Sequence, residues 1–206
     1  MRNLINSLGA FILKMLSLEE SNDELITLSR RTFSFQDGTE GFYFLNYKTH
    51  HVLLISLKYS EERAVARVLR PLYGALSEVR TSVPANNERM VLIPFPQSRL
   101  RVLKRGFNQT RRLLGEMMRL DTKKLFYFET NNLIKIRETK KQALLSRTER
   151  LVAQGGAFKV RRPERLKGKT ILLFDDIVTT GASLAEARKT LLNAGAGEVI
   201  CVALAH

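Results

Sequence analysis

The sequence predicts an α/β fold, in which a mostly parallel sheet is flanked by helices and preceded by a small N-terminal helix and β-hairpin module. From Val91 onward, short apolar runs alternate with helical patterns, an order typical of βαβ units. These runs are apolar at almost every position, as expected of strands covered on both faces. The 206 residues suit one large domain, or one domain with a small appendage.

The first fifty residues predict a helix and then a hairpin. Leu4, Leu8 and Met15 recur at helical spacing, which indicates an amphipathic helix. Aromatic residues alternate on both sides of Asp37-Gly38, a turn signal between two strands, with a loop of two or more residues. We therefore predict an N-terminal module at residues 1–50 and a main domain at residues 51–206.

The main domain begins with a helix from about residue 60 to residue 79, which Pro71 kinks or divides. Strands are expected at residues 91–96, 133–136, 156–160, 171–174 and 198–205, and helices at residues 108–120, 143–152 and 183–195. The last helix has distinct ends, because Ser183 and Glu186 form a capping-box pattern and Gly195 can close it.

Positive charge is concentrated in one part of the chain. The formal net charge is +14, and residues 97–169 hold 21 Lys and Arg against 6 Asp and Glu. Such a segment predicts a positive field that attracts the phosphates of a small ligand or of nucleic acid. A solvated basic face is the alternative.

The cysteine content and hydropathy indicate a cytoplasmic protein without membrane insertion. Cys201, the only cysteine, lies in an apolar run, where a buried core role is expected. One cysteine excludes an internal disulfide framework and a cysteine zinc site. No apolar run approaches the roughly 20 residues of a membrane-spanning helix.

Two adjacent carboxylates, Asp175 and Asp176, follow the apolar run 171–174. Ligands of open α/β sheets bind beyond the carboxyl ends of the strands, so this pair is expected at the functional edge. Carboxylates accept hydrogen bonds from sugar hydroxyls, whereas threonine hydroxyls, backbone N–H groups and a helix N-terminus after Gly181 suit a phosphate. The pattern predicts a ribose-phosphate site; Mg²⁺-dependent nuclease chemistry and a plain turn are the alternatives.

The stretch LLFDDIVTTGAS (172–183) resembles the phosphoribosyl pyrophosphate (PRPP) motif of type I phosphoribosyltransferases. The resemblance implies that Asp175 and Asp176 hold the ribose, and that Mg²⁺ arrives with PRPP near this pair. It implies contacts to the 5-phosphate from Val178, Thr179, Thr180, Gly181, Ala182 and Ser183.

Two further stretches, VLIPFPQSRLRVLKRGFNQ (91–109) and IRETKKQALLSRTERLVAQGGAF (136–158), resemble the ComF family, phosphoribosyltransferase-like proteins linked to DNA uptake. The candidates for a pyrophosphate loop are Gln97, Ser98, Arg99, Lys104 and Arg105. The candidates for a mobile loop or nucleic-acid contact are Arg137, Lys140, Lys141, Gln142, Arg147 and Arg150, and a plain basic connection is the alternative.

The chain departs from the ComF pattern in two places. Many ComF relatives carry an N-terminal zinc module with two C-x-x-C pairs, but this chain has no cysteine there, so no zinc is expected. Gln154 stands where the family has an asparagine.

The resemblance implies a PRPP-binding protein of the ComF type that assists uptake and handling of single-stranded DNA in natural transformation, with a helicase-like partner. One alternative is a metabolic phosphoribosyltransferase that transfers ribose 5-phosphate from PRPP to a small acceptor. Another is a PRPP-sensing regulator that binds nucleic acid. Whether the chain catalyses a transfer stays open at this point.

Overall fold

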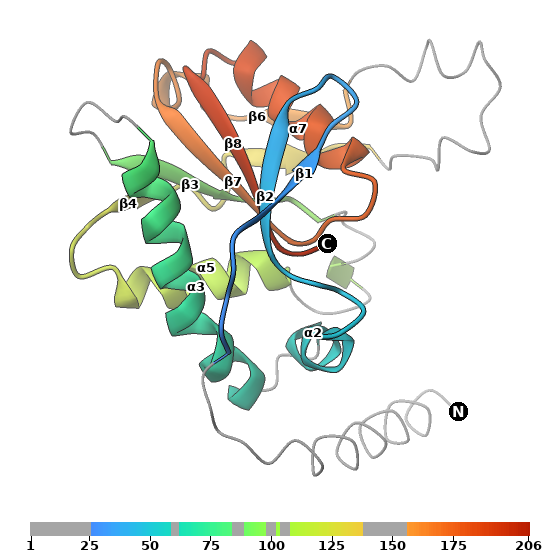
Figure 1. Ribbon diagram of the computed structural model, residues 1–206. Helices are drawn as coiled ribbons and strands as arrows, with labels where there is room; N and C mark the ends of the chain where they lie inside the picture. The colour runs from blue at the N-terminus through green and yellow to red at the C-terminus, as the bar shows by residue number, and fades with distance from the viewer. Residues whose placement is uncertain (1–25, 59–61, 84–88, 98–101, 104–107, 138–155) are drawn as a thin grey trace, which may run out of the picture.

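The structure is a computed structural model that describes residues 26–58, 62–83, 89–97, 102–103, 108–137 and 156–206. A six-stranded sheet forms its centre (Figure 1). The strands are β1 (Arg31–Ser34), β2 (Glu40–Leu45), β3 (Met90–Pro94), β4 (Phe126–Phe128), β7 (Thr170–Ile177) and β8 (Glu198–Ala205), in the spatial order β1-β2-β8-β7-β3-β4. All neighbouring pairs are parallel except β1 and β2. The predicted fold class, mostly parallel α/β, is confirmed.

The three central strands are buried because their side chains are apolar on both faces. In β7, Leu172 and Phe174 pack in one core cluster, whereas Ile171 and Leu173 pack in the other. This alternation follows from the two-residue period of a strand. It explains why the sequence shows continuous apolar runs rather than alternating ones.

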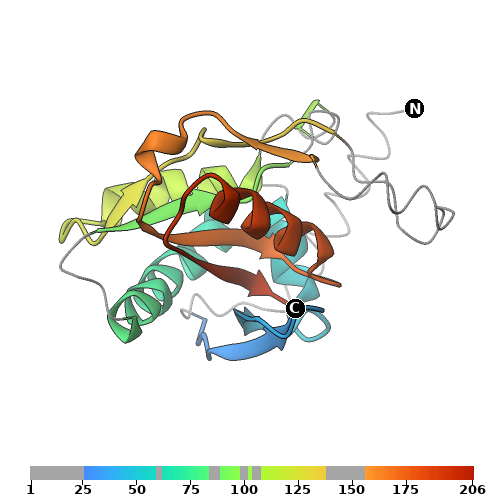
Figure 2. The same ribbon diagram turned by 90° about the horizontal axis from the view of Figure 1, so that it is seen from above.

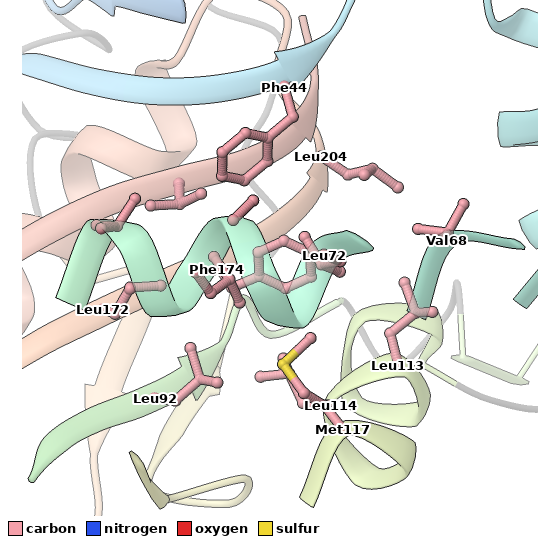
Figure 3. Packing of buried hydrophobic residues seen from close by; sticks show 14 of the residues in the cluster. Phe44, Val68, Leu72, Leu92, Leu113, Leu114, Met117, Leu172, Phe174 and Leu204 are labelled. Carbon is pink, nitrogen blue, oxygen red and sulfur yellow. The ribbon is translucent and has the colours of Figure 1, made fainter. Parts of the chain in front are cut away.

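Helices α2 (His51–Lys58), α3 (Glu62–Ser82) and α5 (Gln109–Leu120) contribute to the first core cluster. Figure 3 shows Val68 and Leu72 of α3 and Leu113, Leu114 and Met117 of α5 meeting the side chains of β3, β7 and β8. Helix α3 continues through Pro71, so the proline does not divide it.

Helix α7 (Ala182–Asn193) lies on the opposite face (Figures 1 and 2). Its Leu184, Ala187 and Leu191 are buried in the second cluster. Gly195, with φ +94°, follows its end and donates its N–H to the Leu192 carbonyl. The prediction that Gly195 ends this helix is therefore confirmed.

The predicted hairpin is present as β1 and β2, and it is part of the main sheet. Its loop is longer than two residues: the N–H of Phe35 bonds the Thr39 carbonyl at 2.8 Å. Strand β2 pairs in parallel with β8 along the other side. The boundary predicted at residue 50 stays a prediction, and the helix expected near the N-terminus lies outside the described residues.

Two strands differ from their expected place. Strands β5 (Leu133–Lys135) and β6 (Phe158–Val160) pair with each other, antiparallel, in a separate two-stranded sheet. Leu133 and Phe158 pack in the second core cluster beside α7, so this ribbon covers the main sheet rather than extending it. At the edge of the main sheet, β3 pairs in parallel with β4, a strand that the sequence pattern did not predict.

Cys201 is fully buried in β8, as predicted. Across the described residues, no helix combines the length and apolar character needed to cross a membrane.

Candidate functional site

Asp175 and Asp176 lie within the last residues of β7. Asp175 is opposite Ala203 of β8, and Ile177 is opposite Ala205. The strand therefore extends to Ile177, beyond the end expected at Phe174. Because β8 is long enough to keep pairing up to Ala205, the ladder holds the acid pair in extended backbone at the carboxyl edge of a central strand.

Local hydrogen bonds orient both carboxylates. The N–H of Asp176 donates to Oδ1 of Asp175 at 2.8 Å, and the N–H of Ile177 donates to Oδ1 of Asp176 at 2.9 Å. Asp175 is buried and Asp176 is half-buried. Two carboxylates held in this way present acceptors for hydroxyl groups or a cation at the sheet edge.

The loop 178–183 continues directly from the acid pair. Val178 is buried, and its N–H donates to the Ala205 carbonyl at 2.9 Å, which fixes the loop to the end of β8. Thr179 and Thr180 are exposed. Oγ1 of Thr180 accepts the N–H of Ala182 at 3.5 Å, which leaves both threonine O–H groups as donors on the surface. The backbone N–H of Val178, in contrast, is used within the fold.

Gly181 turns the chain into α7. It is the N-cap residue, with φ +72°, a left-handed conformation that favours glycine. A Cβ atom here would lie 3.2 Å from the Phe35 ring, so the hairpin directly supports the loop. The first N–H groups of α7 have no partners within the helix, and the helix dipole adds positive potential at this end.

The predicted capping box is wrong. Gly181, rather than Ser183, is the N-cap residue of α7, so no side-chain hydrogen bond caps this end of the helix. Oε1 of Glu186 accepts the N–H of Ala157 at 3.0 Å instead. The carboxylate thus joins α7 to the β5–β6 ribbon, and Ser183, half-buried in the first turn of α7, is not used as a cap.

The segment after β3 lies beside β7 at the same edge. The N–H of Phe95 donates to the Phe174 carbonyl at 2.7 Å, and Nδ2 of Asn108 donates to the Phe95 carbonyl at 3.3 Å. Gln97 follows in this segment and is half-buried. The other predicted pyrophosphate-loop residues, Ser98, Arg99, Lys104 and Arg105, lie outside the described residues.

Of the predicted mobile-loop residues, Arg137 is described: it is exposed and directly follows the β5–β6 ribbon. Its N–H donates to the Ala157 carbonyl at 3.4 Å. Lys140, Lys141, Gln142, Arg147 and Arg150 lie outside the described residues.

An open cavity of about 750 Å³ lies next to this edge, between the end of β3, the first turns of α5, the β4–β5 connection and β5. Gln97 lines it, but the acid pair and the loop 178–183 do not. Arg111, Arg112, Lys135 and Arg161 contribute its cations, and we call it the basic cavity. Basic pairs are evident in this part of the sequence, but no sequence signal indicates that they converge.

Comparison with known proteins agrees with this geometry. Residues 110–206 match the family described as Phosphoribosyl transferase domain. The chain is 30% identical over 151 residues to the DNA utilization protein YhgH of Escherichia coli O157:H7, a match that covers 72% of this chain and 63% of the relative. For the protein of the same description from Escherichia coli strain K12, identity is 31% over 150 residues, with 71% and 63% covered.

Two solved structures are also similar. One, described as the allosteric regulatory enzyme of purine biosynthesis, has 18% identity and a TM-score of 0.37, with 64% of this chain and 25% of that chain covered. The other, a Trypanosoma cruzi hypoxanthine phosphoribosyl transferase, has 11% identity and a TM-score of 0.37, with 73% and 63% covered.

The sheet and the family match define a protein with the type I phosphoribosyltransferase fold. Together with the curated relatives, they support the predicted resemblance to ComF proteins of that fold. The matched region spans 63% of the length of these relatives.

Proposed function

We propose that the chain binds PRPP at the acid pair and the loop 178–183. The observation that supports this most strongly is the order of groups at the carboxyl end of β7. Two oriented carboxylates are followed, after Ile177 and Val178, by two exposed threonines, and then by a glycine of positive φ that opens a helix. Sugar hydroxyls and a phosphate a few ångströms apart match this order of acceptors and donors.

Each group has a distinct role in this proposal. Asp175 and Asp176 accept hydrogen bonds from the 2- and 3-hydroxyls of the ribose. Thr179, Thr180 and Ser183 donate to the 5-phosphate, together with N–H groups of the first turn of α7. Val178 contributes by fixing the loop to β8, because its N–H is bonded to Ala205.

The acid pair also fits Mg²⁺, since this ion prefers carboxylate oxygens and binds in proteins together with substrate phosphates. The described residues contain no group of three or more His, Cys, Asp or Glu side chains positioned to hold a metal. When bound with PRPP, Mg²⁺ would neutralise charge on the pyrophosphate. Asp175 and Asp176 would orient the ribose beside it.

We further propose that this PRPP-binding protein assists the handling of single-stranded DNA in the cytoplasm. Support comes from the relatives described as DNA utilization proteins and from the basic residues 97–169. The ComF resemblance adds natural transformation and a helicase-like partner to the proposal.

Calorimetric titration with PRPP and Mg²⁺ tests the proposal. The native chain is compared with Asp175→Asn/Asp176→Asn and with a control, Glu116→Gln/Glu198→Gln. The control removes the same charge from a half-buried position on α5 and an exposed position on β8. Circular dichroism verifies that all three are folded. We expect binding by the native chain and the control, and loss of binding in the first variant.

Equal binding by all three proteins would contradict the assignment of the acid pair, and no binding by the native chain would contradict PRPP as the ligand. Release of pyrophosphate from PRPP with added nucleobases would establish the alternative, a metabolic phosphoribosyltransferase. PRPP binding without release, together with nucleic-acid binding, fits a DNA-handling protein or a PRPP-sensing regulator.

A further inference from the structure

We propose that the basic cavity binds a segment of single-stranded nucleic acid, separately from PRPP. This inference rests on the proposed function, because it assigns the DNA-handling role to a site of its own. The cavity lies beside the acid pair, yet neither aspartate and no residue of the loop 178–183 lines it. Gln97, a candidate for the pyrophosphate loop, does line the cavity, so the strand and the ribose 5-phosphate part of PRPP would occupy neighbouring but different surfaces.

The described residues of the cavity carry charge of one sign. Among those that line it are four cations, Arg111, Arg112, Lys135 and Arg161, and no Asp or Glu. The nearby Glu129 is buried, and its Oε1 is paired with Arg165 at 2.9 Å. Cations from separate elements thus converge on one opening, which concentrates positive potential where a polyanion can enter.

The fold fixes the backbone that holds these cations. Asn132, which is fully buried, joins the β4–β5 connection to the end of β6: its carbonyl accepts the N–H of Arg161 at 2.9 Å. Its side chain accepts the N–H of Arg162 at 2.8 Å and donates to the Arg162 carbonyl at 3.0 Å. Arg161 therefore projects from a rigid corner.

The opposite wall is fixed in a similar way. Oδ1 of Asn108 caps α5 by accepting the N–H of Arg111 at 3.1 Å, and the Asn108 amide also donates to the Phe95 carbonyl. The first turns of α5 are thereby attached to the segment after β3. This geometry places Arg111 and Arg112 at the helix end whose dipole favours anions.

Part of the lining is apolar, and this favours a nucleotide chain over a small inorganic anion as the ligand. Its apolar residues are Pro94, Pro96, Val102, Leu133, Ile134 and Ile136. Ile136 is 50% exposed, so an apolar surface lies open beside the charges. Phosphates can contact the cations while unpaired bases cover this surface, an arrangement that a duplex with paired, stacked bases does not offer.

No Phe, Tyr or Trp is among the described residues that line the cavity, so from these residues base stacking on aromatic rings contributes little. Phosphate contacts are then expected to dominate affinity, with a steep dependence on salt and little sequence preference. The volume of about 750 Å³ falls in the range of ordinary ligand pockets. The cavity is therefore expected to hold a few nucleotides of a longer strand.

The test measures the fluorescence anisotropy of labelled oligothymidylate with the full chain over a series of salt concentrations. Arg111→Glu/Arg161→Glu reverses two exposed cations of the cavity. Arg119→Glu/Lys189→Glu is the matched control, because it changes the net charge equally at exposed positions of α5 and α7 outside the lining. Calorimetry with PRPP and Mg²⁺ is run on both variants.

We expect the cavity variant to bind oligothymidylate at least about tenfold more weakly than the control, with a log–log salt slope reduced by about 1.4 for two lost phosphate contacts. Its PRPP affinity should stay within about threefold of the control, because neither arginine is among the residues proposed to bind the ribose 5-phosphate. Asp175→Asn/Asp176→Asn should lose PRPP and keep the oligonucleotide.

Three results would overturn the inference: equal oligonucleotide binding by the two charge variants, no binding by the native chain, or displacement of the oligonucleotide by inorganic pyrophosphate alone. Joint loss of PRPP and oligonucleotide in the cavity variant would also overturn it, since the surfaces would then be one. The PRPP proposal is tested by a different experiment, the calorimetric titration of the native chain with PRPP, so failure of one proposal can be told from failure of the other.

Discussion

Gly181 determines how the loop after β7 enters α7. Its φ of +72° lies in the left-handed region, and the Phe35 ring lies against the place of a side chain. At Gly115, inside α5, an added Cβ atom would meet no heavy atom within 4 Å. The two glycines therefore form a matched pair with opposite expected responses to alanine.

Gly181→Ala should lower the free energy of unfolding by about 1–2 kcal/mol because of the left-handed backbone. PRPP binding should weaken about tenfold or more as the loop shifts, equivalent to about 1.4 kcal/mol. Gly115→Ala should raise stability by up to about 1 kcal/mol through helix propensity and leave PRPP binding unchanged. Denaturant unfolding and calorimetry measure these effects, and equal responses of the two variants would contradict the role given to Gly181.

Burial raises the pKa of the Cys201 thiol to about 12. A raised pKa favours the protonated form in the folded chain, so its stabilising effect is full at neutral pH and is lost as the pH rises from about 8.5 toward 12. At about pH 8.5 the native chain should resist iodoacetamide, whereas the unfolded chain should react as a normal thiol. Mass spectrometry measures the adduct, and rapid labelling of the native chain would contradict the burial of Cys201.

At the scale of elements, Asp121 connects α5, α3 and β4. Its carboxylate accepts the N–H of Leu125 at 2.8 Å, the N–H of Phe126 at 3.0 Å and the hydroxyl of Tyr73 at 3.0 Å. Burial, followed by the hydrogen bond to Asp121, raises the pKa of Tyr73. The residue thus fixes the start of the edge strand to two helices.

Asp121→Ala should lower the free energy of unfolding by about 3 kcal/mol, because buried N–H donors lose a charged acceptor. Glu116→Ala, which removes an exposed ion pair of the same helix, should cost less than about 1 kcal/mol. Urea unfolding compares them, and a double-mutant cycle with Tyr73→Phe isolates the hydroxyl contact. A cost for Asp121→Ala no larger than that for Glu116→Ala would contradict this account.

The sequence patterns predicted the helices and strands that are determined by their own residues, and missed features that depend on contacts with distant parts of the chain. The strands β3, β7 and β8 were evident because both faces of each are apolar. Strand β4 was missed because three residues carry almost no period, and its place depends on pairing with β3. The capping box failed because Glu186 has a tertiary partner, the N–H of Ala157, that no local pattern reveals.

The candidate site divides in the same way. Asp175 to Ser183 could be predicted because the residues are contiguous in sequence. The basic cavity could not be predicted, since Arg111, Lys135 and Arg161 meet only through the packing of α5 and the β5–β6 ribbon.

At the scale of the whole molecule, a ligand that binds only the folded chain should stabilise it. At PRPP concentrations about 100 times the dissociation constant, with Mg²⁺, the gain is about 2.7 kcal/mol, or a rise in Tm of about 5–10 °C for a chain of this size. Differential scanning calorimetry should show this rise for the native chain and less than about 1 °C for Asp175→Asn/Asp176→Asn. An equal rise in both would place the ligand elsewhere.

The most direct test of the central claim maps PRPP onto the backbone by NMR. With PRPP and Mg²⁺, we predict amide chemical-shift changes concentrated at residues 175–184, around the acid pair and the loop 178–183. Unchanged amides in that segment at saturating PRPP would contradict the account, as would changes confined to another part of the chain.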